Sequence, residues 1–236
     1  MDLTDLTLIV PTKNEAHSIH RFLETIPADL RVVFVDASTD GTDAIIRRLG
    51  RRRIHILRDD GNIAAARQLG AERAQTEWLL FTDADVLFAA DYFSTLASLQ
   101  PEAHWGGIVG AKLSRRRHRS YYRLFSLGMQ LCCALGVPAA SGSNMLVRRR
   151  TLQAAGGFDR RLSCNEDSEL MWRIRRQGCR VVYASTLQVF EFDHRRLDTG
   201  AVRKTAHSLL RCTLLFFDLL HDTLRTHDWG YWGNDG

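Results

Sequence analysis

Short apolar runs alternate with longer amphipathic segments through the first hundred residues of the chain. The runs have the length and the Val- and Ile-rich composition of buried strands, and they lie at residues 7–11, 32–36, 54–57 and 78–83. Between the first two runs, apolar residues recur at helical spacing, namely Ile19, Phe22, Leu23 and Ile26. Further helices are expected around residues 45–49 and over residues 61–75. This alternation predicts βαβ units and a mostly parallel sheet with helices on both faces.

The second half of the chain has a less regular pattern. We expect strands at residues 104–113 and 180–183, a strand entered from the loop at 141–147, and a turn at the GGFD segment, 156–159. Helices are expected at 115–135, at 165–177 with Asn165 as the N-cap, and at 201–224. Because no linker or repeat interrupts residues 1–236, we predict one α/β domain with a helical C-terminal extension from about residue 199.

Composition narrows the class of protein only a little. Hydrophobic residues make up 45% and charged residues 25% of the 236 residues, as in ordinary globular proteins, and the net charge of +5 suits an anionic partner. The five cysteines show no C-x-x-C spacing, which disfavours a disulfide framework or a structural zinc site. The N-terminus lacks the pattern of a signal peptide, so we expect a cytoplasmic location.

Polar residues gather where the predicted strands end. PTKNE follows the first strand, Asp36 ends the second, and Asp83 and Asp85 follow the fourth. Ligands of parallel sheets bind beyond the carboxyl ends of the strands, so these residues are expected to face one site. The acidic pair has two interpretations: it caps a helix near residues 89–99, or it holds a cation.

Five segments together resemble family 2 glycosyltransferases of the GT-A fold, of the bacterial type that uses nucleotide sugars. They are, in chain order, LIVPTKNE, VVFVDASTDGT, the DAD of LLFTDADV, GGFD and NEDSELMWRIRRQG. The resemblance covers roughly residues 7–185 and implies a GT-A, Rossmann-like fold. It assigns about residues 1–100 to nucleotide-sugar binding and about residues 101–198 to the acceptor and the chemistry.

The resemblance implies a nucleoside-diphosphate sugar as donor, with a UDP-sugar favoured and a GDP- or dTDP-sugar as alternatives. It also implies Mg²⁺ or Mn²⁺, because a divalent cation stabilises the charge that grows on the leaving diphosphate. In the family the second acid of the motif, here Asp85, contacts the metal, while the first, here Asp83, faces the nucleoside. Oxygen ligands of this kind suit both cations.

Further residues match the family's nucleotide-sugar contacts. Asp36 matches an acid that accepts hydrogen bonds from the base or ribose, and Pro11, Thr12 and Glu15 match the loop around the nucleoside. Taken alone, Asp36 is also typical of a turn, and Glu15 is typical of the first turn of a helix. Arg67 matches a helix that approaches the nucleotide, although a solvated helix arginine is an equally good interpretation.

The chemistry of the resemblance rests on an acidic pair. Asp167 matches the general base of an inverting transfer, which takes the proton of the acceptor hydroxyl as that oxygen attacks the sugar. Glu166 is the less favoured base, and Glu169 stands where the family often has Asp. Acids in the first turn of a helix also have a purely structural explanation in the helix dipole.

The segment FEFDHRR extends the implied site. Some relatives use a histidine here as a metal ligand and neighbouring arginines to hold the departing diphosphate, and His194, Arg195 and Arg196 match those positions. A histidine before two arginines is also an ordinary surface feature.

A basic and aromatic segment at residues 114–136 turns apolar toward its end, as does the helix predicted at 201–224. Both are expected either to lie at the inner face of a membrane, beside a lipid-linked or saccharide acceptor, or to be helices with solvated basic faces. The resemblance implies a role in cell-surface polysaccharide or glycolipid synthesis and no nucleic-acid partner.

Three other enzyme classes fit the sequence less well. A dehalogenase-type phosphatase places D-x-D after its first strand, while a nucleotidylyltransferase and a Rossmann dehydrogenase need a glycine-rich loop that PTKNE does not provide. The remaining alternative is a degenerate GT-A fold that binds nucleotide sugars or assembles with other proteins. The presence of both Asp85 and Asp167 argues against it, because a binding protein needs no base.

Overall fold

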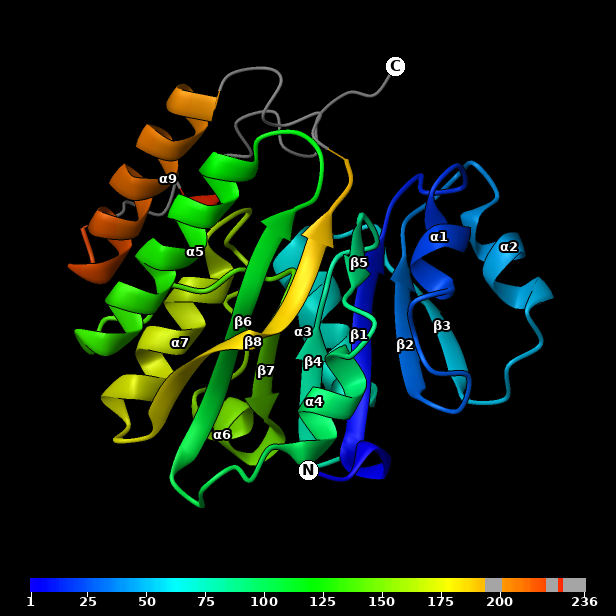
Figure 1. The fold of residues 1–236 in the computed structure, drawn as a ribbon, viewed down its shortest axis with the longest axis horizontal. Helices are drawn as coiled ribbons and strands as arrows, with labels where there is room; N and C mark the ends of the chain where they lie inside the picture. Colours follow the sequence, from blue (N-terminus) through cyan, green and yellow to red (C-terminus); the bar gives the residue numbers. More distant parts are fainter. Residues whose placement is uncertain (194–200, 220–224, 227–236) are drawn as a thin grey trace.

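The computed structural model of the chain describes residues 1–193, 201–219 and 225–226. An eight-stranded sheet runs through it in the order β3-β2-β1-β4-β7-β6-β8-β5, with helices packed on both faces (Figure 1). The strands are β1 (Leu6–Thr12), β2 (Arg31–Asp36), β3 (Ile54–Arg58), β4 (Trp78–Phe81), β5 (Val86–Phe88), β6 (Trp105–Ser114), β7 (Met145–Arg148) and β8 (Arg180–Glu191). The helices are η1 (Leu3–Asp5), α1 (Ile19–Leu23), α2 (Thr42–Arg48), α3 (Ile63–Arg73), α4 (Tyr92–Ser98), α5 (Arg119–Ala134), α6 (Arg149–Ala154), α7 (Glu166–Arg176) and α9 (Ala201–Phe216).

The sheet is mixed, with parallel pairing predominant. Strands β3, β2, β1 and β4 are parallel to one another, and β8 is parallel to β6. Strand β7 is antiparallel to β4 and β6, and β5 is antiparallel to β8. Since β7 pairs with strands from both halves of the sequence, the sheet is continuous through them. The prediction of a mostly parallel sheet flanked by helices is confirmed.

The sheet packs against helices through an apolar layer on each of its faces. Alternate residues of β1 serve opposite faces: Leu8 and Val10 pack with α1 residues such as Phe22, while Ile9 packs with α3 and α7. All seven residues of β1 are buried, which explains why the strand reads as a continuous apolar run and not as an alternating one.

Several sequence expectations need correction. The helix expected near 89–99 begins at Tyr92 after the separate short strand β5, so Asp83 and Asp85 do not cap it. Strand β8 continues to Glu191, well beyond the expected 180–183, because it pairs with both β6 and β5. Asn165 stands at the start of α7 without a side-chain capping bond, and its amide donates to Ser208 and Cys212 of α9 instead.

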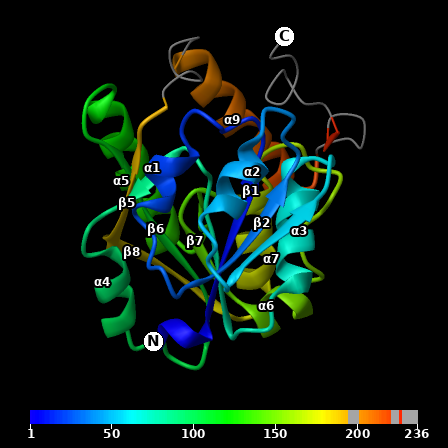
Figure 2. The same cartoon turned by 90° about the vertical axis from the view of Figure 1, so that its right-hand side faces the viewer.

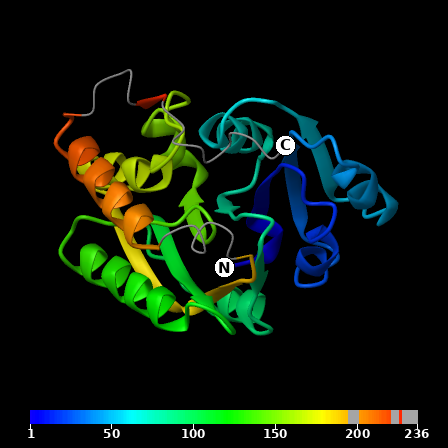
Figure 3. The ribbon, with the colours of Figure 1, turned by 90° about the horizontal axis from the view of Figure 1, so that it is seen from above.

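The carboxyl ends of all the parallel strands meet at one edge of the sheet, the upper edge in Figure 1 and the edge that faces the viewer in Figure 3. Helix α9 lies against α7, and Figure 2 shows α3 and α7 on one face of the sheet and α4 on the other. The expected helix at 201–224 is confirmed as far as Phe216, while residues 220–224 lie outside the described part. The loops that carry the polar motifs all emerge at this edge.

Candidate active site

Asp36 ends β2 and is completely buried. Its carboxylate accepts hydrogen bonds from Thr12 Oγ1 at 2.8 Å and from Ser38 Oγ at 2.6 Å, and it forms an ion pair with Arg58, the last residue of β3. A buried carboxylate requires such partners, because an unpaired charge away from water is costly. The acid therefore ties the ends of three neighbouring strands together.

The loop after β1 is bound to the loop after β2. Asn14 adopts a left-handed conformation, with φ of 57°, and its amide oxygen accepts a bond from Thr39 N at 3.0 Å. The Glu15 N–H donates to Thr42 Oγ1 at 2.9 Å, and the Glu15 carboxylate accepts a bond from Ser18 Oγ at 2.5 Å. These bonds shape the loop before any ligand is present.

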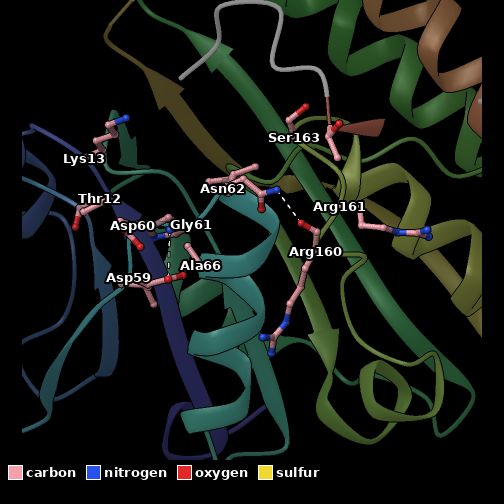
Figure 4. Close-up of a pocket in the computed structure, with 15 residues that line it drawn as sticks. Thr12, Lys13, Asp59, Asp60, Gly61, Asn62, Ala66, Arg160, Arg161 and Ser163 are labelled. Atoms are coloured by element: carbon pink, nitrogen blue, oxygen red, sulfur yellow. Dashed lines mark hydrogen bonds between the residues drawn. The ribbon is translucent and has the colours of Figure 1, made fainter. Parts of the chain in front are cut away.

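A pocket of about 510 Å³ opens beside these loops (Figure 4). Pro11 and Thr12 line it as expected for nucleoside contacts, whereas Asp36 and Glu15 lie outside its lining. Lys13 of the loop after β1 also lines it. Other lining residues come from the β3–α3 loop and from the segment before α7, and they include Asp59, Asp60, Asn62, Arg160, Arg161 and Ser163. The side-chain amide of Asn62 donates to the backbone oxygen of Arg160 at 2.7 Å, so the pocket joins the two halves of the chain. Its volume falls within the range of small-molecule sites.

Arg67 on α3 lies at the centre of a buried charge network. Its guanidinium donates to Asp83 Oδ1 at 2.8 Å and forms an ion pair with Glu166, while only 3% of its side chain is exposed. The interpretation of Arg67 as a solvated helix residue is therefore wrong. The arginine links Asp83 after β4 with Glu166 at the start of α7, and its pair with Glu166 joins residues 99 positions apart in the sequence.

Asp167 is held by backbone groups. One carboxylate oxygen accepts the Gly142 N–H and the other accepts the Ser168 N–H, each at 2.7 Å. Burial raises the pKa of Asp167, although Arg67 and the two backbone donors oppose that shift. Burial likewise raises the pKa of Glu166, again against the effect of Arg67. The two acids thus differ in their partners. Glu166 forms an ion pair with Arg67, whereas Asp167 accepts hydrogen bonds from backbone N–H groups.

The backbone at Gly142 packs closely against the end of the Arg67 side chain. A Cβ added there would lie 2.1 Å from the guanidinium of Arg67, closer than any real contact. The Gly142 N–H can therefore donate to the Asp167 carboxylate while the Arg67 guanidinium lies directly against Gly142. The next residues continue the network, since Ser143 Oγ donates to Asp83 and Asn144 donates to the backbone oxygens of Ala111 and Leu187.

Lys112 on β6 connects the charge network to the end of β8. Its ammonium group donates to Ser143 Oγ at 2.9 Å and forms an ion pair with Glu191 at the end of β8. Burial alone would lower the pKa of Lys112, but Glu191, Asp85 and Asp83 outweigh that effect and raise it. Sequence reasoning missed Lys112, Ser143, Glu191 and Arg58. The one available signal was the SGSN segment, in which small polar residues directly precede a buried strand.

Asp85 lies beside Glu191, and both have the chemistry of cation ligands. Asp85 Oδ1 is buried and has no hydrogen-bond partner, as expected for an acid that meets a hard cation. Burial, followed by Asp85, raises the pKa of Glu191 to about 8. Within the described part of the chain, no group of three or more His, Cys, Asp or Glu side chains is arranged to hold a metal ion. The residues present therefore fit a cation whose remaining ligands are water and substrate oxygens.

Three predicted site residues, His194, Arg195 and Arg196, lie outside the described residues. The others gather at one edge of the sheet in two groups. Pro11, Thr12, Glu15 and Asp36 belong to the pocket side, and Arg67, Asp83, Asp85, Glu166 and Asp167 belong to the charge network. The sequence interpretation of Asp83 and Asp85 as helix caps is excluded.

Two curated proteins are similar to the chain in sequence. The chain is 28% identical over 198 residues to the succinoglycan biosynthesis protein ExoA of Rhizobium meliloti, covering 75% of this chain and 60% of that protein. It is 24% identical over 210 residues to the pre-mycofactocin glycosyltransferase of Mycobacterium tuberculosis, covering 81% of this chain and 43% of that protein. The chain therefore spans less than two thirds of the length of these relatives.

Solved structures share the fold. The mannosyltransferase PcManGT from Pyrobaculum calidifontis, in complex with GDP-Man and Mn²⁺, has a TM-score of 0.72 at 24% identity, over 97% of this chain and 71% of that one. TarS of S. aureus in complex with UDP-GlcNAc has a TM-score of 0.64 at 17% identity, over 98% and 76% of the two chains. The expected GT-A fold is confirmed. The sequence profile described as glycosyl transferase family 2 matches residues 7–156, and the chain belongs to this family.

Proposed function

We propose that this protein transfers a sugar, with inversion, from a nucleoside-diphosphate sugar to a hydroxyl group of a saccharide or lipid-linked acceptor. The observation that carries the proposal is the Arg67 network, which brings Asp83 of the first half within one side chain of Glu166 and Asp167 of the second half. A site that only bound nucleotides would need the pocket alone. An attacking hydroxyl also needs a carboxylate that takes its proton. Asp167, which is held by two backbone N–H groups, is the carboxylate that would do so.

On the donor side, the pocket lined by Pro11 and Thr12 would receive the nucleoside. Asp36 and Glu15 shape the two loops, and a direct contact of either acid with the base or ribose remains a prediction. Asp83, whose side chain is 25% exposed, is the acid of the Arg67 network that is open to the donor. Arg67 would act mainly by fixing Asp83 and Glu166.

On the acceptor side, Asp167 would take the proton of the attacking hydroxyl. Its two N–H bonds orient the carboxylate and leave further lone pairs on each oxygen. Glu166 is the weaker choice of base because its charge is already engaged by Arg67.

Asp85 would hold Mg²⁺ or Mn²⁺, and His194 stays a predicted additional ligand. When bound, the cation supplies Lewis-acid stabilisation of the leaving diphosphate. Arg195 and Arg196 are predicted to hold the same leaving group. PcManGT binds its GDP-Man with Mn²⁺, which supports a divalent ion here.

A donor screen tests the proposal. Purified protein with Mn²⁺ would be offered UDP-, GDP- and dTDP-sugars with simple saccharide acceptors, scoring the release of nucleoside diphosphate, and the product's anomeric configuration would be read by NMR. We expect one donor, with a UDP-sugar favoured, to be consumed with inversion. Nucleotide binding without turnover of any donor would favour the alternative, a degenerate binding protein, and retention of configuration would contradict the assignment of the base.

We also propose that the protein works at the cytoplasmic face of a membrane, in the synthesis of a cell-surface polysaccharide or glycolipid. Four leucines form one exposed stripe along α5 and its C-cap residue, namely Leu124, Leu127, Leu131 and Leu135, which are 58–72% exposed. Exposed arginines, Arg119 and Arg123, flank the stripe. None of the described helices is long and apolar enough to cross a bilayer.

Vesicle co-sedimentation tests the membrane contact. The protein should co-sediment with vesicles containing phosphatidylglycerol at low salt, and Leu127→Glu should release it. If the wild-type protein stays in the supernatant at low salt, the stripe has another role.

A further inference from the structure

Two carboxylates meet where β5 pairs with β8. Val86, the residue after Asp85, is opposite Glu191 in the register of these antiparallel strands, and the Phe192 N–H donates to the backbone oxygen of Asp85 at 3.3 Å. Backbone pairing thus fixes Asp85 and Glu191 as neighbours. Glu191 lies in the FEFDHRR segment, three residues before His194, but the sequence alone indicated no role for it.

The hydrogen bonding of this pair is incomplete. The side chain of Glu191 is only 4% exposed, and its Oε1 atom is buried without a hydrogen-bond partner. Oδ1 of Asp85 is in the same condition. Buried acceptors without donors are rare in native proteins, because each one loses its interaction with water and gains nothing in return.

Lys112 accounts for only part of this arrangement. Its ammonium group pairs with Oε2 of Glu191 and also donates to Ser143, which in turn donates to Asp83. Lys112 is therefore the neighbour of three acids, Glu191, Asp85 and Asp83. Even with this lysine present, Oε1 of Glu191 has no hydrogen-bond donor. A purely structural ion pair with Lys112 would not require a second carboxylate beside it, since like charges at short range repel.

We propose that Glu191 is a second protein ligand of the divalent cation held by Asp85, and that Lys112 is the positioning residue that fixes the Glu191 carboxylate. A hard cation between the two acids would satisfy both unpartnered oxygens at once. Mg²⁺ and Mn²⁺ are commonly bound by one or two carboxylates, with substrate phosphates and water as the other ligands. The inference rests on the proposed function in that it assumes the Asp85 cation site.

The test measures Mn²⁺ binding without any donor. Purified protein would be titrated with Mn²⁺, and the free ion would be followed by its EPR signal. Glu191→Gln keeps the size of the side chain and an acceptor for Lys112 but removes the charge, so it should weaken Mn²⁺ binding at least about 10-fold. Glu102→Gln, which removes an exposed carboxylate elsewhere, is the matched control and should bind as the wild type does.

A second set of variants separates the possible failures. If Glu191→Gln binds Mn²⁺ like the wild type while Asp85→Ala does not, the present inference is overturned and the Asp85 site stands. If neither variant loses binding, the proposed metal site fails as well. Should Glu191→Gln not fold, Glu191→Asp keeps the charge and shortens the reach by one methylene. That variant is expected to bind Mn²⁺ more weakly than the wild type, and unchanged affinity would contradict the assignment.

Lys112→Met tests the positioning role. Loss of the ammonium group should weaken Mn²⁺ binding, because the Glu191 carboxylate loses the partner that orients it. Lys112→Arg keeps a positive charge at this position and should retain most of the wild-type affinity. An affinity equal to that of the wild type in Lys112→Met would show that the lysine does not position the ligand.

Discussion

The two sides of the sheet edge are built in different ways. On the nucleotide side, Asp36, Thr12, Ser38 and Arg58 come from the ends of three adjacent parallel strands, and their bonds stay within one local unit. On the other side, Arg67 of α3 forms ion pairs with Asp83 of the β4–β5 loop and with Glu166 of α7. Lys112 of β6 forms an ion pair with Glu191 of β8. These pairs join residues that are far apart in the sequence. The first side draws on residues 12–58 alone, whereas the second draws on residues spread from Arg67 to Glu191.

This difference predicts a division of labour. Changes on the nucleotide side should alter donor affinity, because they deform the loops around the pocket. Changes in the charge network should alter turnover or the stability of the whole protein, because the network both positions the acids and joins the two halves. Single substitutions on each side distinguish the two effects.

The largest effect is expected for Asp85→Ala. Removing the acid at the proposed cation site should lower kcat by at least about 10³-fold, since Lewis-acid stabilisation of a leaving diphosphate is worth several kcal/mol. Turnover would be measured by the release of nucleoside diphosphate, with Asp91→Ala as the surface control. Undiminished turnover of the wild-type protein in excess EDTA would contradict the metal assignment.

Removal of the Arg67 charge should destabilise the protein most. Arg67→Met leaves two acids without their buried partner and should lower the free energy of unfolding by about 3–5 kcal/mol in urea titrations. The control is Arg47→Met, because Arg47 is 61% exposed and its pair with Asp43 should contribute less than about 1 kcal/mol. Similar losses in the two variants would mean that the network does not hold the halves together.

The pH profile gives a smaller but specific signature. Because burial raises the pKa of Asp167, the acid limb of kcat should lie above the pH expected for an ordinary aspartate, whose pKa is about 3.9. An acid with a raised pKa binds its proton more tightly in the folded state, so protonation stabilises the fold as the pH falls. Activity should therefore disappear on acidification while thermal melting still shows a folded protein. A profile with an unshifted acid limb would contradict the assignment of Asp167 as a base with a raised pKa.

The sequence predicted the local side of the site better than the network. Regular βα alternation located the first four strands, and the motifs placed Pro11 and Thr12 in the pocket. The pairing of Arg67 with Glu166, however, depends on how α3 and α7 pack, and spacing along the chain carries no trace of it. Lys112 and Glu191 were missed for the same reason: a charged residue near the end of a strand resembles an edge residue until its partner on another strand is known.

Strand β8 illustrates a second limit. Its exposed and half-buried positions do not alternate regularly, because it pairs with β6 through a shifted register along its length and also with the short strand β5 over its last three residues. Period-two patterns identify strands that have one uniform environment. They are weaker for a strand that gains a second neighbour only near its end, and it is at this end of β8 that Glu191 lies beside Asp85.

The most direct test of the division of labour compares Asp167→Asn with Asp36→Asn. Donor dissociation constants and kcat would be measured for both variants, with Glu166→Gln as the control for the neighbouring acid. We expect Asp167→Asn to lower kcat by about 10²–10⁴-fold, as loss of a general base does, and to leave the donor dissociation constant within a few-fold. Asp36→Asn should instead weaken donor binding and spare kcat at saturating donor. If Asp167→Asn keeps near-normal turnover, if Glu166→Gln loses more, or if both aspartate variants change the same parameter, the account is contradicted.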